Sequence, residues 1–204
     1  MKDKNTELRD FLHRNKGRKI IVVQGLGFVG SVMSLVCANP LFGEHCVIGV
    51  DLPTTNGLKI IKSLNSGVFP LNTNDPDVYD LYQKTRINKN FLATCDKSAY
   101  EYADIIIVDI NLDVEKFNSI NGNLNNYDVS MSNFKNAIND IASRCKKNIL
   151  LLLESTVPPG TCQNIIKPIF KRCFKSRSIN TSHIAIGHSY ERVMPGPNYI
   201  DSIQ

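Results

Sequence analysis

The sequence predicts an α/β fold, a doubly wound parallel sheet with helices on both faces. Two observations lead to this class. Short apolar runs alternate along the chain with longer amphipathic stretches, which is the pattern of strands joined by helical, right-handed crossovers. The apolar runs, such as "KIIVVQG" and "DIIIVDI", are continuous rather than alternating, so each strand is expected to be covered on both faces.

The expected strands are apolar runs that end at polar residues or glycine. They are placed at 19–25, 45–51, 91–94, 104–110, 148–154 and 183–189. The helices between them are expected from apolar spacing of three and four residues, as in Leu8, Phe11 and Leu12. They are placed at 5–14, 28–39, 54–67, 75–87, 96–103, 130–145 and 160–175. The Asn-rich stretch 111–128 is expected to be a loop, and the absence of a linker predicts one domain over residues 1–204.

Composition narrows the class of protein. Of the 204 residues, 42% are hydrophobic and 21% are charged, as in a globular protein with a sizeable core. No apolar run approaches the roughly 20 residues of a membrane helix, and the polar N-terminus does not resemble a secretory signal. The six cysteines form neither CxxC pairs nor clusters with His, which favours reduced thiols in a cytoplasmic protein and no metal site.

The net charge of +5 raises the question of nucleic-acid binding. Much of the charge lies in "KPIFKRCFKSR", residues 167–177. A basic patch is one interpretation, but no nucleic-acid motif accompanies it. We favour a solvated helix face whose apolar residues, Ile169, Phe170 and Phe174, turn inward, and we expect no nucleic-acid partner.

Three glycines stand where the first strand meets the first long helix. The stretch "GLGFVG" has the G-x-G-x-x-G spacing of a dinucleotide-binding turn. In such a turn Gly25 permits the sharp bend, Gly27 leaves room for a pyrophosphate, and Gly30 lets the helix pack closely. The helix N-terminus then offers free N–H groups to the phosphates. The expected cofactor contacts here are Gly25, Leu26, Gly27, Phe28, Val29 and Gly30.

An acidic residue follows at the distance that this motif requires. Asp51 ends the second expected strand, about 20 residues after the last glycine. Its carboxylate is placed to accept hydrogen bonds from an adenosine ribose, and it would repel a 2′-phosphate, so NAD is favoured over NADP. The alternative is a plain glycine turn with an unrelated surface Asp, but the strand–turn–helix–strand setting favours a Rossmann-like cofactor site.

A second set of polar residues follows the strand "NILLLL". Glu154, Ser155 and Thr156 lie at its carboxyl end, where open α/β sheets bind ligands. On physical grounds alone, a strand-to-helix connection with a hydroxyl cap is equally well supported. Further on, Glu191 and Arg192 in "YERVMPG" are suited either to contact a ligand or to pair with each other.

Together these segments resemble the UDP-glucose/GDP-mannose dehydrogenase family, the nucleotide-sugar 6-dehydrogenases. The likeness rests on "GLGFVG" with Asp51, "LNSGVFPL", "ESTVPPGT" and "YERVMPG", which occur in the family's order over residues 19–196. With "VDINLDVEK", the pattern looks most like the branch that acts on UDP-N-acetylhexosamines. Two positions depart from the family: Asn111-Leu112 replaces Thr-Pro, and Tyr190-Glu191 replaces Pro-Glu.

The resemblance implies an enzyme that oxidises the C6 hydroxyl of a UDP-sugar to a carboxylate with two NAD. It places Ser155 and Thr156 at the cofactor, and gives Glu154, Thr156 and Glu191 supporting catalytic roles. It also implies a homodimer formed through a central helical region, and a nucleophilic Cys in a Gly-rich setting in a later domain. No cysteine here has that setting, although Cys162 comes nearest at a helix start. We therefore expect this chain to be the NAD-binding part of a longer enzyme and to be inactive alone.

Two rival interpretations stay open at this point. One is the first domain of a hydroxyacid or 6-phosphogluconate-type dehydrogenase, which shares the glycine motif but has no reason to contain "STVPPGT" followed by "ERVMPG". The other is an NAD-binding module without catalytic activity.

Overall fold

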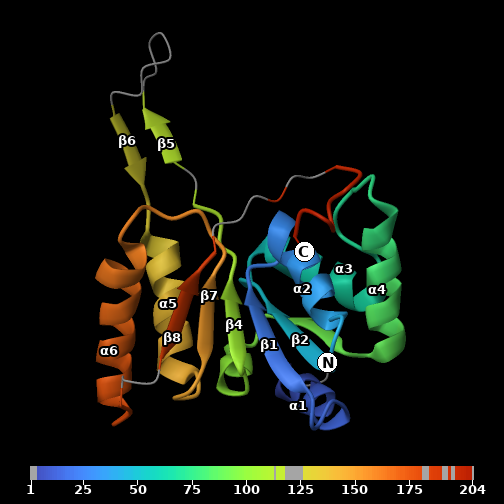
Figure 1. Ribbon diagram of the computed structural model, residues 1–204, viewed down its shortest axis with the longest axis horizontal. Helices are drawn as coiled ribbons and strands as arrows, with labels where there is room; N and C mark the ends of the chain where they lie inside the picture. Colours follow the sequence, from blue (N-terminus) through green and yellow to red (C-terminus); the bar gives the residue numbers. More distant parts are fainter. Residues whose placement is uncertain are drawn as a thin grey trace.

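A six-stranded parallel sheet forms the centre of the molecule, with the strand order β3-β2-β1-β4-β7-β8 (Figure 1). The computed structural model describes residues 4–112, 114–117, 126–180, 184–189, 193 and 196–203. The strands are β1 (Lys19–Gln24), β2 (His45–Val50), β3 (Phe91–Thr94), β4 (Ile105–Val108), β7 (Leu150–Leu153) and β8 (Ala185–His188). The order reverses between β1 and β4, and ligands bind at the carboxyl ends of the strands at such a switch point.

The helices fall into two groups, one on each side of this switch point (Figure 1). Beside β1, β2 and β3 lie α2 (Phe28–Ala38), α3 (Thr55–Ser66) and α4 (Pro76–Asn88); beside β4, β7 and β8 lie α5 (Ser132–Arg144) and α6 (Lys167–Ser176). The other helical elements are α1 (Lys4–Arg14), a 3-10 helix η1 (Lys97–Glu101) capped by Asp96, and a π-helical segment η2 (Cys162–Ile166) that leads into α6. The predicted α/β class is confirmed.

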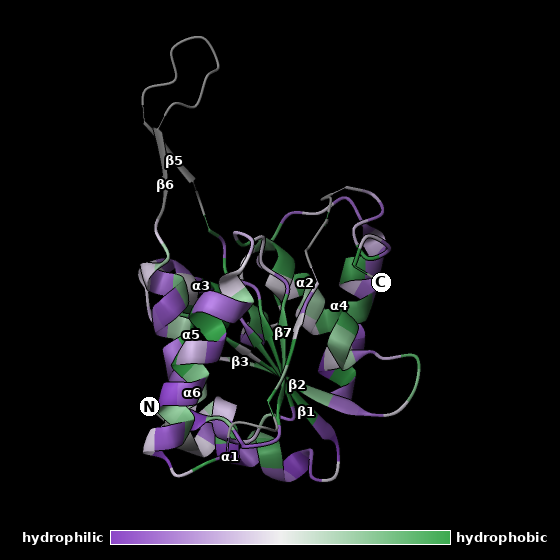
Figure 2. Ribbon diagram, turned by 60° about the vertical axis from the view of Figure 1, so that its left-hand side comes forward, coloured by the Kyte–Doolittle hydropathy of each residue, from purple (hydrophilic) through white to green (hydrophobic). Residues whose placement is uncertain are grey.

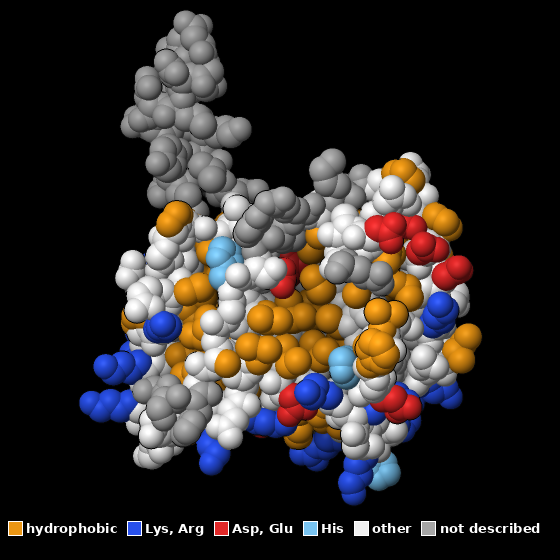
Figure 3. All heavy atoms as spheres, in the orientation of Figure 1, with side chains coloured by type: hydrophobic (Ala, Val, Ile, Leu, Met, Phe, Trp, Pro, Cys, Tyr) orange, Lys and Arg blue, Asp and Glu red, His pale blue; other side chains and the backbone are white. Residues whose placement is uncertain are grey.

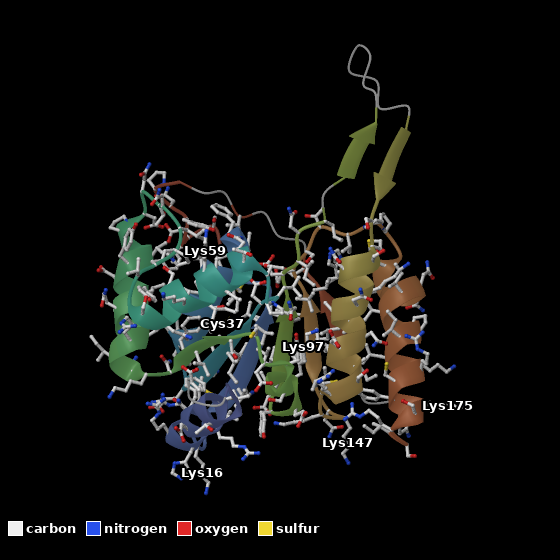
Figure 4. The ribbon with its side chains drawn as sticks, turned by 180° about the vertical axis from the view of Figure 1, so that it is seen from behind. Lys16, Cys37, Lys59, Lys97, Lys147 and Lys175 are labelled. Atoms are coloured by element: carbon white, nitrogen blue, oxygen red, sulfur yellow. The ribbon has the colours of Figure 1, made fainter. Side chains whose placement is uncertain are left out.

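The main core lies between the sheet and the pair α5 and α6. Val22, Ile106 and Leu151 from the strands pack in one buried cluster with Phe134 of α5 and Phe170 of α6. Figure 2 shows the apolar strands inside and the polar surfaces of the helices outside. The lysines of α6 are exposed, and Figure 4 shows Lys175 on the outer side of that helix. The predicted division of α6 into a basic outer face and an apolar inner face is confirmed. In the part of the chain that the structure describes, no helix is long and apolar enough to cross a bilayer.

Cover on both faces, expected for every strand, is incomplete at β7 and β8. Leu151 and Leu153 are buried against α5 and α6, whereas Leu150 and Leu152 on the other face are only half-buried. Figure 3 shows hydrophobic side chains gathered on this side of the molecule. The reason is topological. The crossover helices α5 and α6 both pack on the face of the sheet that carries Leu151 and Leu153. The opposite face, which carries Leu150 and Leu152, therefore has no crossover helix over these strands.

The loop expected over 111–128 is wrong in part. Two strands, β5 (Val114–Phe117) and β6 (Asn126–Val129), form an antiparallel pair that projects from the body of the molecule (Figure 1). Backbone pairing joins Val114 to Val129 and Phe117 to Asn126. Four-residue strands carry too little alternation to stand out against an Asn-rich background.

The edge strand β3 is closed by a side chain. The amide of Asn65, on α3, donates to the carbonyl of Ala93 at 2.8 Å, and its Oδ1 accepts from the N–H of Ala93 at 3.0 Å. These two bonds replace the pair that a further strand would make, so the outer side of β3 is satisfied at Ala93.

Candidate functional site

A cavity of about 430 Å³ opens at the carboxyl end of the sheet, at the switch point between β1 and β4. Its walls come from the ends of β1, β2 and β4 and from η1, α3 and α5. Four of the residues expected to bind a cofactor line it: Gly25, Leu26, Gly27 and Asp51. The glycine motif and Asp51 therefore line a cavity at the switch point.

The three glycines occupy three different environments. Gly25 has φ +98°, a left-handed conformation that favours glycine, and a Cβ there would lie 1.9 Å from the carbonyl oxygen of Asp109. At Gly30 a Cβ would lie 1.9 Å from the carbonyl oxygen of Gly25, so the start of α2 packs directly on the turn. At Gly27 a Cβ would meet nothing within 4 Å. The geometry is that of a tight turn and a close helix approach, with open space at the middle glycine.

The N-terminus of α2 faces this space without a side-chain cap. Gly27 is the N-cap residue, and the first turn contains no acidic residue. The first N–H that bonds back within the helix is that of Ser31, to Gly27 O at 3.1 Å. By contrast, α3 and α4 begin with side-chain caps, Thr54 and Asp75. The free N–H groups and partial positive charge of α2 are therefore available to an anion.

Asp51 is fixed to the turn by its own carboxylate. Oδ2 accepts from the N–H of Leu26 at 3.1 Å, and Oδ1 accepts from the N–H of Leu52 at 2.6 Å. These bonds hold the carboxylate beside the glycines and leave each oxygen further lone pairs for a ligand hydroxyl. Sequence reasoning anticipated the position of Asp51 but not its link to Leu26.

Residues from helices that sequence reasoning did not select form the far wall. Lys97 of η1 (labelled in Figure 4) pairs with Asp140 of α5, with Nζ 2.5 Å from Oδ2. Beneath them the Tyr100 hydroxyl donates to Oε1 of Gln24, and burial raises the pKa of this phenol well above its ordinary value. The phenol therefore stays neutral and remains a donor.

The charge of the lining is mainly negative. Three carboxylates, those of Asp51, Asp109 and Asp140, line the cavity together with Lys97, whose ammonium is already paired with Asp140. A ligand with an extra phosphate at this end would meet these carboxylates rather than a free lysine or arginine among the lining residues.

The second predicted cluster lies beside the cavity rather than in its wall. Ser155 is buried, and its Oγ accepts from the N–H of Ile110 at 2.8 Å and donates to Val108 O at 3.3 Å. Ile110 lines the cavity, so the bond from its N–H to Ser155 fixes the position of one cavity wall although Ser155 itself is not part of the lining. Glu154 is half-buried and Thr156 is exposed. The ligand roles predicted for these three residues remain predictions.

The other predicted positions divide as follows. Phe28, Val29 and Gly30 form the first turn of α2, above the lining glycines. Glu191, together with Tyr190 and Arg192, lies outside the described residues. Cys162 is half-buried at the start of η2. Among the described residues, no three His, Cys, Asp or Glu side chains are grouped to hold a metal.

The domain is a Rossmann-type dinucleotide-binding domain. This class is defined by the order of the parallel strands, by a glycine turn that leads into an uncapped helix, and by an acidic residue after β2. The sequence profile described as "UDP-glucose/GDP-mannose dehydrogenase family, NAD binding domain" matches residues 19–204. The chain belongs to this family, and its cofactor is NAD.

Individual relatives agree with this membership. The UDP-N-acetyl-D-mannosamine dehydrogenase of Methanocaldococcus jannaschii is 30% identical over 185 residues, which cover 88% of this chain and 36% of the relative. The GDP-mannose 6-dehydrogenase of Pseudomonas syringae pv. tomato is 28% identical over 158 residues, covering 75% of this chain and 32% of the relative.

A solved structure, the NDP-N-acetyl-D-galactosaminuronic acid dehydrogenase of Methanosarcina mazei Go1, superposes with a TM-score of 0.77 at 25% identity. The match covers 95% of this chain and 38% of that structure. The chain thus spans little more than a third of the length of the relatives that it matches.

Proposed function

We propose that this chain binds NAD with the pyrophosphate over Gly27 and the adenosine ribose on Asp51. The observation that carries the proposal is the uncapped start of α2, which faces open space at Gly27 directly beside a carboxylate anchored to Leu26. The N–H groups of Phe28, Val29 and Gly30 are suited to the phosphate oxygens. The negative lining of the cavity further favours NAD over NADP.

We propose that the parent enzyme oxidises the C6 hydroxyl of a nucleotide sugar, with UDP-N-acetylhexosamine as its substrate. Support comes from the motifs "ESTVPPGT" and "YERVMPG" and from relatives named UDP-N-acetyl-D-mannosamine dehydrogenase. When bound, NAD accepts the hydrides, while the chain orients the cofactor and excludes water. Thr156 and Glu154 are proposed to contact the reacting end, with Glu191 as a further candidate.

We propose that the 204 residues are one cofactor-binding domain of a longer, homodimeric cytoplasmic enzyme. The match with the Methanocaldococcus jannaschii relative covers 88% of this chain but only 36% of that protein, and the half-buried Leu150 and Leu152 give the sheet an apolar face for further polypeptide to cover. The six free thiols are compatible with a reducing compartment. The nucleophilic Cys of the reaction is proposed to lie in the additional sequence.

Titration calorimetry of the 204-residue chain with NAD and NADP tests the cofactor proposal. We expect NAD to bind more tightly, and a preference for NADP would contradict the role of Asp51. NADH formation from UDP-N-acetylhexosamines, assayed with this chain and with the extended gene product, tests the rest. Turnover by this chain alone that is lost in Cys162→Ser would overturn the placing of the nucleophile in later sequence.

A further inference from the structure

The described C-terminal turn, residues 196–203, packs against the start of α2 (Figure 1). Tyr199 is buried, and its hydroxyl donates to the carbonyl oxygen of Phe28 at 2.5 Å. Its ring stacks on the Phe28 ring, with centroids 4.9 Å apart and planes 20° from parallel. Phe28 is the first residue of α2, directly after the lining residue Gly27. Tyr199, far along the chain, thus holds the peptide between Phe28 and Val29, the first peptide of α2.

The contact acts on a group that would face the ligand. The carbonyl of Phe28 and the N–H of Val29 belong to one planar trans peptide, in which the two groups point in opposite directions. Fixing the carbonyl from behind therefore fixes the direction of the Val29 N–H, which precedes the first intrahelical donor, Ser31. A hydrogen bond to the carbonyl also polarises the peptide and makes its N–H a better donor.

Tyr199 is itself held from the opposite side. The N–H of the next residue, Ile200, donates to Oδ2 of Asp75 at 2.9 Å. Asp75 is buried, and its other oxygen accepts from Asp77 N at 2.9 Å as the N-cap of α4. Tyr199 and Ile200 also belong to the buried cluster that contains Val78 and Tyr82 of α4. The C-terminal turn, residues 196–203, is therefore bound to α4 through Asp75 and to the start of α2 through Phe28.

We propose that Tyr199 is a positioning residue for NAD, which orients the Val29 N–H toward the pyrophosphate through its bond to the Phe28 carbonyl. The inference rests on the proposed placing of the pyrophosphate at the start of α2. It adds a residue outside the glycine motif to the groups that determine cofactor affinity.

The test compares Tyr199→Phe with a matched control, Tyr82→Phe. Both tyrosines are 1% exposed, lie in the same cluster and donate to a backbone carbonyl, since Tyr82 bonds Leu64 O at 2.6 Å. Each variant removes one hydroxyl and retains the ring, so both lose a similar amount of stability. The measurements are the melting temperature, the Kd for NAD by calorimetry, and the Kd for adenosine by ligand-observed NMR.

We expect Tyr199→Phe to weaken NAD binding by about three- to tenfold, the scale set by one hydrogen bond, and to leave adenosine binding unchanged because adenosine has no pyrophosphate. Tyr82→Phe should change neither affinity. Equal NAD affinity in Tyr199→Phe and wild type would overturn the inference, as would an equal loss for adenosine, which would indicate general loosening. Failure of the wild-type chain to bind NAD would instead overturn the proposed function, and the inference with it.

Discussion

The carboxylate of Asp51 and the backbone N–H of Leu26 are joined by a hydrogen bond of 3.1 Å. The bond links the end of β2 to the middle of the glycine turn that follows β1. The residue expected to hold the ribose therefore also shapes the turn expected to hold the pyrophosphate, and the two halves of the site are not independent.

Asp51→Ala should weaken NAD binding by about 1.5–3 kcal/mol, the range for hydrogen bonds to a charged group. It should also lower the melting temperature, because the N–H groups of Leu26 and Leu52 lose their acceptor. Calorimetry and thermal unfolding measure the two effects. Asp51→Asn keeps one acceptor oxygen but turns an NH2 group toward the second N–H, so it should recover only part of the stability and of the affinity. An NAD affinity unchanged in Asp51→Ala would contradict the ribose contact.

Gly27→Val should abolish NAD binding and leave the fold intact. The new side chain would enter the open space proposed for the pyrophosphate, where a Cβ meets no protein atom within 4 Å. Gly30→Ala is the contrasting variant: its Cβ would lie 1.9 Å from the carbonyl oxygen of Gly25, so it should destabilise the domain itself. Circular dichroism melts and NAD titration separate the two outcomes. Normal NAD binding by Gly27→Val would mean that this turn is purely structural.

Ser155→Ala should destabilise the domain by about 1–3 kcal/mol, because the N–H of Ile110 loses its acceptor in a buried setting. The adjacent Thr156 is exposed, so Thr156→Val should leave the free energy of unfolding within about 0.5 kcal/mol of wild type. Urea unfolding of both variants provides the measurement. Equal stability of the two variants would contradict the structural role of Ser155.

The buried thiols should make stability fall in alkaline solution. Burial raises the pKa of Cys46 and of Cys145 from 9.0 to about 11. Above pH 9 the unfolded chain loses these protons while the folded chain retains them, so the free energy of unfolding declines from about pH 9 to pH 11. Urea unfolding over this range measures the decline. It should be shallower in Cys46→Ala/Cys145→Ala, and an identical slope would contradict the assignment.

The sequence was sufficient for the parts of the site that are local in the chain. The turn at Gly25–Gly30 and the carboxylate of Asp51 are set by neighbouring residues and by the rule that parallel strands share a carboxyl edge. The end of β4 follows the same rule: Asn111, at the position where the resembling family has Thr, lines the cavity, and applying the rule to each strand would also have identified Ile110 from the sequence.

The rest of the site depends on packing between distant segments. Lys97 and Asp140 meet only because η1 and α5 lie against the same end of the sheet, and neither residue has a sequence signature. The contact of Tyr199 with Phe28 joins positions 171 residues apart. Such pairs are decided by tertiary geometry, which local propensity and periodicity do not encode.

The side chain of Asn65 has a consequence for the behaviour of the protein in concentrated solution. An open edge strand is a template on which other chains can add by backbone pairing, the usual first step toward aggregation. At β3 the groups of Ala93 that would start such pairing are already bound to Asn65. One amide on a neighbouring helix thus occupies, at Ala93, the pair of backbone groups that an added strand would bond there, which makes β3 a poorer template for strand addition.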